Sequence, residues 1–213
     1  MRIATILAIL ILVAHVEPAF ADDLNPPEWR GEANTTSQVW DFTEEKTLPA
    51  TYLPDGPATG GLDPLPGTQA VSYSADWDSE LYGREGVFSF CYPNDYIEVT
   101  VDNYDQTNDW KWVRIQVAWQ EIVGDQISII DLNPAPLEGD GPHHVSRLSL
   151  EGSWWEQTWE FFLRPNPEQE SFKIEAASAY VDKVIIDTWC NPEPATLSLL
   201  ALGGLALTRR RRN

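Results

Sequence analysis

The chain has 213 residues, and its 14 Lys and Arg against 33 Asp and Glu give a formal net charge of −19. An acidic chain with no basic stretch in its body lacks the cationic footprint that phosphate binding needs, which excludes nucleic acid as a partner. A hydrophobic content of 43%, with 10 Trp, 7 Tyr and 7 Phe, excludes a disordered acidic chain, and the length suits one domain.

Residues 1–21 have the pattern of a secretory signal peptide. Arg2 precedes an apolar run from Ile3 to Ala14, and Ala19-Phe20-Ala21 has the small-x-small pattern that signal peptidase accepts. The run is shorter than the roughly 20 residues that span a bilayer. We expect signal peptidase to release a mature chain that begins at Asp22; the alternative is a buried N-terminal helix.

The body, residues 22–190, has short runs in which apolar and polar residues alternate, and no helical period of useful length. Ile97, Val99 and Val101, for example, alternate with polar residues. About ten such runs predict an all-β fold, a two-sheet antiparallel sandwich of jelly-roll type with one dry and one wet face per sheet. The predicted strands are 38–42, 69–73, 87–91, 97–102, 112–120, 127–132, 145–150, 155–163, 172–176 and 181–188.

Residues 46–68 contain five prolines and four glycines. This composition predicts a long irregular loop within the sandwich domain, of the kind that serves as a lid or a binding loop.

The two cysteines, Cys91 and Cys190, both fall at the ends of predicted strands. In an exported chain an oxidising compartment favours pairing them. The sequence therefore predicts a disulfide, whose long loop would stabilise the fold by about 4–5 kcal/mol in the chain-entropy model.

The tryptophans divide into two groups. Trp119, Trp155 and Trp159 are in phase with apolar neighbours, which predicts core packing. The others lie on the opposite phase or beside turns, where exposed indoles can stack on sugar rings or cover the second face of a sheet. The candidates for a glycan platform are Trp77, Trp110, Trp112 and Trp154.

Little in the sequence points to metal or catalytic chemistry. Acidic clusters at 76–78, 102–109 and 138–140 offer calcium ligands but lack the EF-hand spacing. We therefore expect acidic, solvated turns and no cofactor, with a structural calcium ion as the alternative. The adjacent pair His143-His144 would point to opposite faces of a strand, so we expect no metal site there.

No common catalytic motif is present, and we expect that the protein is not an enzyme. Glu156 and Glu160 share a strand face but lie roughly 13 Å apart, whereas glycosidase carboxylates are about 5–9.5 Å apart. A sandwich-fold polysaccharide hydrolase that uses a carboxylate from another strand is the alternative.

The C-terminus combines three features in order. Pro192, Glu193 and Pro194 precede an apolar run from Ala195 to Leu207, and a cluster of arginines follows. The run predicts a short transmembrane helix over 195–208, about 20 Å long against a core of about 30 Å. The positive-inside rule places the arginines in the cytoplasm and the body outside. These arginines are Arg209, Arg210, Arg211 and Arg212.

This arrangement resembles the PEP-CTERM protein-sorting domain of Gram-negative bacteria over residues 191–213. The resemblance implies that Pro192, Glu193 and Pro194 are recognised by an exosortase-type transpeptidase and that the arginines are the cytoplasmic stop. It also implies that the body is delivered to the cell surface or the extracellular space, often alongside exopolysaccharide. The alternative is an ordinary tail anchor with an accidental Pro-Glu-Pro.

The body also resembles secreted sandwiches of the lectin and carbohydrate-binding-module type in its architecture and Trp content. We therefore expect a glycan-binding or structural role, and a coat protein without a small ligand remains a further alternative. Without the signal and the tail, residues 22–192 hold 9 Lys and Arg against 31 Asp and Glu, a net charge of −22.

Overall fold

The computed structural model describes residues 23, 25–32, 34–46, 50–54, 68–102, 110–122, 124, 127–131, 143–164, 166–167, 169–176 and 178–190. Their regular structure is almost entirely β, with one short 3-10 turn, η1 (Glu151–Ser153). The strands are β1 (Thr35–Trp40), β2 (Ala50–Tyr52), β3 (Gln69–Ser72), β4 (Asp76–Leu81), β5 (Arg84–Phe90), β6 (Tyr96–Asp102), β7 (Lys111–Glu121), β8 (Ser128–Asp131), β9 (His143–Ser149), β10 (Trp155–Leu163), β11 (Gln169–Glu175) and β12 (Ala179–Cys190).

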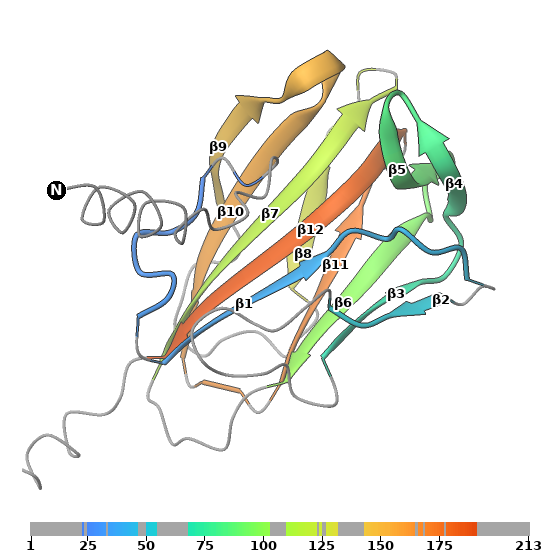
Figure 1. The fold of residues 1–213 in the computed structure, drawn as a ribbon. Coiled ribbons are helices and arrows are strands. Elements are labelled where there is room, and N and C mark those ends of the chain that lie inside the picture. The colour runs from blue at the N-terminus through green and yellow to red at the C-terminus, as the bar shows by residue number, and fades with distance from the viewer. Residues whose placement is uncertain are drawn as a thin grey trace, which may run out of the picture.

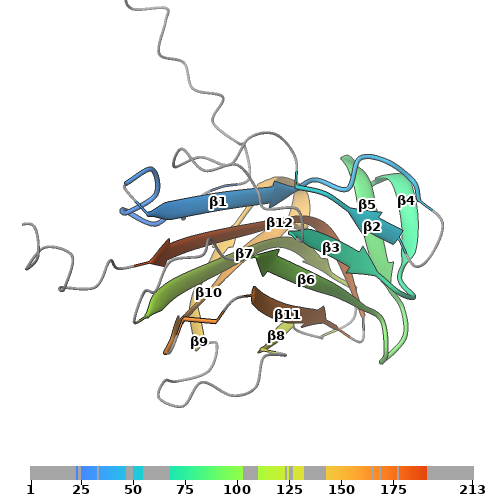
Figure 2. The same ribbon diagram turned by 90° about the horizontal axis from the view of Figure 1, so that it is seen from below.

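The strands form two antiparallel sheets that pack face to face (Figure 1; Figure 2). The seven-stranded sheet has the order β4-β5-β12-β7-β10-β9, and β1 pairs with β12 beside β5. The five-stranded sheet has the order β2-β3-β6-β11-β8. This arrangement confirms the predicted two-sheet sandwich. The helices predicted at the two ends lie outside the described residues.

The strand connectivity is that of a jelly roll. From β5 onward the chain crosses between the sheets at every connection except that from β9 to β10. The last strands insert between earlier ones, so that β12 lies between β5 and β7 and β11 lies between β6 and β8. This nesting of late strands between early ones is how two Greek keys close a sandwich.

The core lies between the inner faces of the two sheets, where the alternation in the sequence predicts it. On β6, Ile97, Val99 and Val101 point inward, and Trp119 on β7 and Trp159 on β10 are buried in the same core. Lys111 and Glu170 are 1% and 0% exposed and form an ion pair, Nζ to Oε1 at 2.5 Å, that joins the sheets at one end. A buried ion pair of this kind adds little net stability, because the cost of removing both charges from water offsets their attraction.

The outer face of the seven-stranded sheet is covered by an N-terminal strap, residues 23 and 25–32. The Arg30 guanidinium bonds both Asp187 oxygens on β12, at 2.7 and 2.6 Å, and also pairs with Asp23. Asp23 in turn accepts from the Gln116 side chain of β7 at 3.1 Å. The carboxyl of Asp187 is fully buried beneath the strap.

The strap continues this polar layer toward β9 and β10. The Asn25 amide donates to Ser146 and Thr158 at 2.9 and 3.3 Å. Arg114 donates to the Asn25 carbonyl at 2.8 Å and forms an ion pair with Glu160. The expectation of a wet outer face is therefore wrong for the part of this sheet beneath the strap, because Gln116, Thr158 and Asp187 are buried there and bonded to it.

Burial and charge oppose each other in this layer. Burial raises the pKa of the Asp187 carboxyl, while the hydrogen bonds and charge of Arg30, and a hydrogen bond from Ser37, hold the pKa down. Burial would lower the pKa of the Arg30 guanidinium, but the bonds and charges of Asp187 and Asp23 raise the pKa above its usual value. Arg30 thus stays charged under the strap, whereas the pKa of the Asp187 carboxyl is raised overall, because burial outweighs the opposing effect of Arg30.

The predicted disulfide between Cys91 and Cys190 is wrong, since the structure forms no disulfide between these cysteines. Cys91 follows Phe90 of β5, which lies opposite Ala179 at the start of β12. Cys190 ends that 12-residue strand. At about 3.3 Å per residue, the two cysteines are separated by most of the strand, roughly 36 Å.

Two strands differ from the expectations. β2 (Ala50–Tyr52) pairs with β3 inside the segment predicted as the loop 46–68; residues 55–67 lie outside the described residues. The acidic cluster at 76–78 belongs to β4, an edge strand paired with β5, and is not a turn.

Candidate functional site

Two of the four candidate tryptophans contribute to the packing of the fold. Trp154 is 1% exposed, and its indole N–H donates to the Tyr82 carbonyl at 3.4 Å. Trp77 on β4 packs against the core and donates to the Phe42 carbonyl at 2.8 Å. Phe42 has a φ of +51°, so this bond holds a strained backbone turn in place.

The other two candidates belong to a tail-end aromatic cluster, which comprises Trp29, Trp110, Trp112, Phe162 and Trp189. Each of these residues is partly exposed. Trp112 on β7 lies opposite Phe162 of β10 and Trp189 of β12 in the sheet register. Trp189 contacts Trp29 of the strap, with ring centroids 6.1 Å apart, and Trp110, at 5.7 Å. The four candidate tryptophans therefore do not form one platform.

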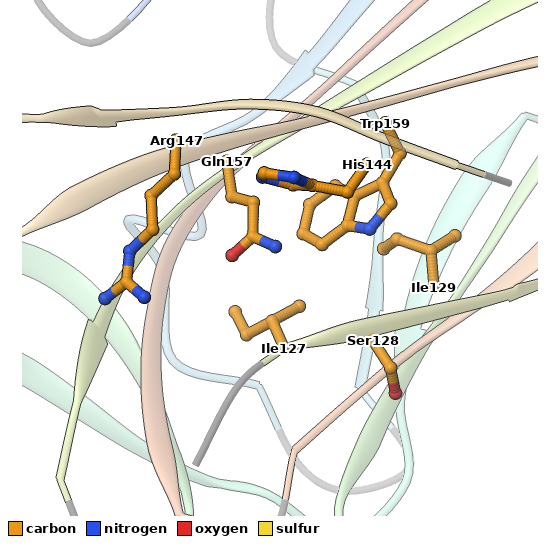
Figure 3. A pocket seen from close by; sticks show the side chains of 7 residues that line it. All are labelled: Ile127, Ser128, Ile129, His144, Arg147, Gln157 and Trp159. Carbon is orange, nitrogen blue, oxygen red and sulfur yellow. The ribbon is translucent and has the colours of Figure 1, made fainter. Parts of the chain in front are cut away.

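A pocket of about 520 Å³ opens at the sandwich edge, between β8 of one sheet and β9 and β10 of the other (Figure 3). Its volume lies in the range of roughly 300–1,000 Å³ that is typical of ligand sites. Apolar and polar side chains face each other across it, as Figure 3 shows. The lining residues are Ile127, Ser128, Ile129, His144, Arg147, Gln157 and Trp159.

Gln157 is the most informative of the lining residues. Its side chain is 6% exposed, and its amide oxygen has no hydrogen-bond partner among the described residues. A buried acceptor left unpaired costs about 1–3 kcal/mol. A ligand that donates a hydrogen bond to this oxygen would recover that cost, so the pocket is suited to a hydroxyl or amine donor.

Aromatic rings hold the polar groups around Gln157 in place. The Arg147 guanidinium lies over the rings of Trp119 and Trp155, 4.7 and 4.2 Å from their centroids. The His144 ring meets the edge of Trp159 at 6.3 Å. Cation–π and edge contacts of this kind fix side-chain positions before a ligand arrives.

The structure also places the residues considered for metal and acid–base chemistry. His144 lines the pocket, and within the described residues no group of three or more His, Cys, Asp or Glu is arranged to hold a metal ion. Glu160 is paired with Arg114 in the polar layer under the strap, and Glu156 is buried on the same face of β10. Neither glutamate lines the pocket.

The sorting residues Pro192, Glu193, Pro194 and Arg209 to Arg212 lie beyond Cys190, outside the described residues. A comparison with known families matches residues 192–212 to the PEP-CTERM protein-sorting motif. The chain carries a PEP-CTERM sorting motif. A comparison with curated proteins finds no match.

The PEP-CTERM motif indicates an exported protein that is anchored at its C-terminus and processed by an exosortase-type system. None of the residues that the structure describes forms a helix long and apolar enough to cross a membrane. The predicted span at 195–208 and the predicted signal peptide at 1–21 both lie outside the described residues.

Sequence reasoning did not find the pocket. Its lining comes from three strands and from Ile127 before β8, and these segments lie side by side only because β9 and β10 form the edge that faces β8. The one available signal was Gln157, a polar residue at an inward position between Trp155 and Trp159. A polar side chain in the apolar phase of a strand is a candidate site residue.

Proposed function

We propose that this exported PEP-CTERM protein is a glycan-binding component of the cell surface or extracellular matrix, and that the pocket between β8 and β10 takes the saccharide. The observation that carries the proposal is the buried, unpartnered amide oxygen of Gln157 inside that pocket. Sugars present many hydroxyl donors, and Ile127, Ile129 and Trp159 offer apolar walls for the ring carbons. Exopolysaccharide is the glycan class that such a surface-sorted protein would meet.

Binding is favoured over hydrolysis by the chemistry of the lining. Glycoside hydrolysis needs two carboxyl groups about 5–9.5 Å apart across the scissile bond. The described lining residues include no Asp or Glu. We therefore assign the protein no enzymatic role. Its own maturation would depend on signal peptidase, which cuts after residue 21, and on an exosortase-type enzyme, which acts at the motif.

The test is a binding titration on the mature chain, with oligosaccharides from bacterial exopolysaccharides as ligands. Gln157→Leu removes the acceptor but keeps the volume, so affinity should fall about 5- to 150-fold, the equivalent of roughly 1–3 kcal/mol. Its matched control is Gln120→Leu, because Gln120 also carries a buried, unpartnered amide oxygen but does not line the pocket.

Each result is decisive. Binding that is lost in Gln157→Leu and retained in Gln120→Leu supports the proposal. If no glycan binds at high protein concentration, the remaining interpretation is a purely structural coat protein. Release of reducing sugar would instead support the alternative of a sandwich-fold polysaccharide hydrolase.

A further inference from the structure

The tail-end aromatic cluster lies where the folded body meets the sorting tail. Trp189, which contacts both Trp29 and Trp110, immediately precedes Cys190, the last residue of β12. The apolar run of the tail begins at Ala195. Five residues, 190–194, therefore separate Trp189 of this cluster from the part of the chain that anchors it.

This short connection restricts how far the cluster can lie from the membrane. From Cys190 to Ala195 the chain makes five steps, which span at most about 18 Å at 3.6 Å per residue. The headgroup layer on one side of a bilayer takes up roughly 5–8 Å of that distance. The opposite end of β12, at Ala179, lies about 36 Å farther along the strand. While the chain is anchored, the cluster end is the part of the body nearest the lipid.

The chemistry of the cluster suits the membrane–water interface. Tryptophan is enriched there because its ring is apolar and its N–H is polar, and four of the five cluster residues are tryptophans. Three ion pairs lie close to the cluster: Asp187 with Arg30, Glu160 with Arg114, and Glu170 with Lys111. The body of net charge −22 would be repelled by anionic headgroups, which favours a contact with zwitterionic lipid.

We propose that the tail-end aromatic cluster contacts the headgroup region of the outer leaflet of the cytoplasmic membrane while the protein is anchored. The contact is made by aromatic rings with zwitterionic lipid, and it orients the sandwich with the end of β12 toward the bilayer. It also holds the Pro-Glu-Pro segment at the membrane surface, where an exosortase-type enzyme acts. This proposal does not depend on glycan binding at the pocket.

The test uses the mature full-length chain inserted in phosphatidylcholine vesicles whose acyl chains are brominated close to the headgroup. Bromine quenches only nearby indoles, so part of the Trp fluorescence should be quenched, and the quenching should persist in high salt because no ion pair with lipid is involved. In Trp110→Phe/Trp112→Phe the quenched portion should fall by at least a third. Trp77→Phe, on β4 in the hairpin with β5, is the control and should leave the quenched portion unchanged.

Unquenched fluorescence in the anchored wild type overturns the proposal, and so does equal quenching in the double variant and in the control. Either result would show that the cluster does not contact lipid and is covered by protein, such as a second copy of the chain. If the double variant does not fold, as judged by its thermal transition, Trp110→Phe and Trp112→Phe are read singly. The wild-type measurement decides the matter in any case.

Discussion

The clearest test of the folded structure is the removal of Arg30 from the strap. Arg30→Ala leaves the fully buried carboxylate of Asp187 without its bidentate partner. Breaking a buried pair by removing one member costs about 3–5 kcal/mol. A domain of this size loses about 2–4 °C of melting temperature per kcal/mol, so Tm should fall by about 6–20 °C.

The loss of stability in Arg30→Ala should be larger at neutral pH than at acidic pH. Burial already raises the pKa of the Asp187 carboxyl, and without Arg30 nothing of comparable strength opposes the rise. The folded variant then binds a proton that the unfolded chain, with a pKa of about 3.9, releases. Stability falls as pH rises through the folded pKa, so the variant should be weakest at neutral pH and should recover toward pH 4–5.

Urea unfolding followed by Trp fluorescence at pH 5 and pH 7.5 measures both effects. The double variant Arg30→Ala/Asp187→Asn is the control, because it removes the charge together with its partner and should lose its dependence on pH. A loss below 1 kcal/mol at neutral pH, or an equal loss at both pH values, would show that the strap does not bury Asp187 in solution.

Two further predictions concern the fold. Gly86 has a φ of +72°, and a Cβ there would lie 2.6 Å from the carbonyl carbon of Phe42. Gly86→Ala should therefore lower Tm by several degrees. A variant as stable as the wild type would contradict this close approach. Because Cys91 and Cys190 form no disulfide in the structure, a reducing agent should leave Tm unchanged, and thiol titration of the denatured, unreduced protein should count two thiols. A count of zero would mean that an intramolecular or intermolecular bridge forms.

The sequence predicted the strands whose two faces differ in polarity. The alternation of Ile97, Val99 and Val101 placed β6 and its inner face, because that strand is dry on one side only. The sequence did not predict β4, since both faces of this edge strand are polar or partly exposed and its polar and apolar residues do not alternate. The Asp76–Asp78 part of it was consequently interpreted as a turn.

The outer face of the seven-stranded sheet shows a different limit. Gln116, Thr158 and Asp187 are polar side chains on this outer face, where the sequence predicts contact with solvent, yet all three are buried. Hydrophobic periodicity separates polar from apolar positions, but it cannot tell water from a layer of hydrogen-bonding protein. The pairing of Cys91 with Cys190 failed for a related reason, because the register that separates them is set by long-range strand pairing.

The position of β12 has a consequence for export. This strand is the last of the body in sequence, yet it pairs with β1, β5 and β7 in the middle of the seven-stranded sheet. That sheet cannot close until residue 190 has crossed the membrane, by which point the sorting segment that begins two residues later is next to enter. The body therefore completes its folding only as its own anchor arrives, so the anchor tethers the chain at the membrane during the slow pairing of distant strands.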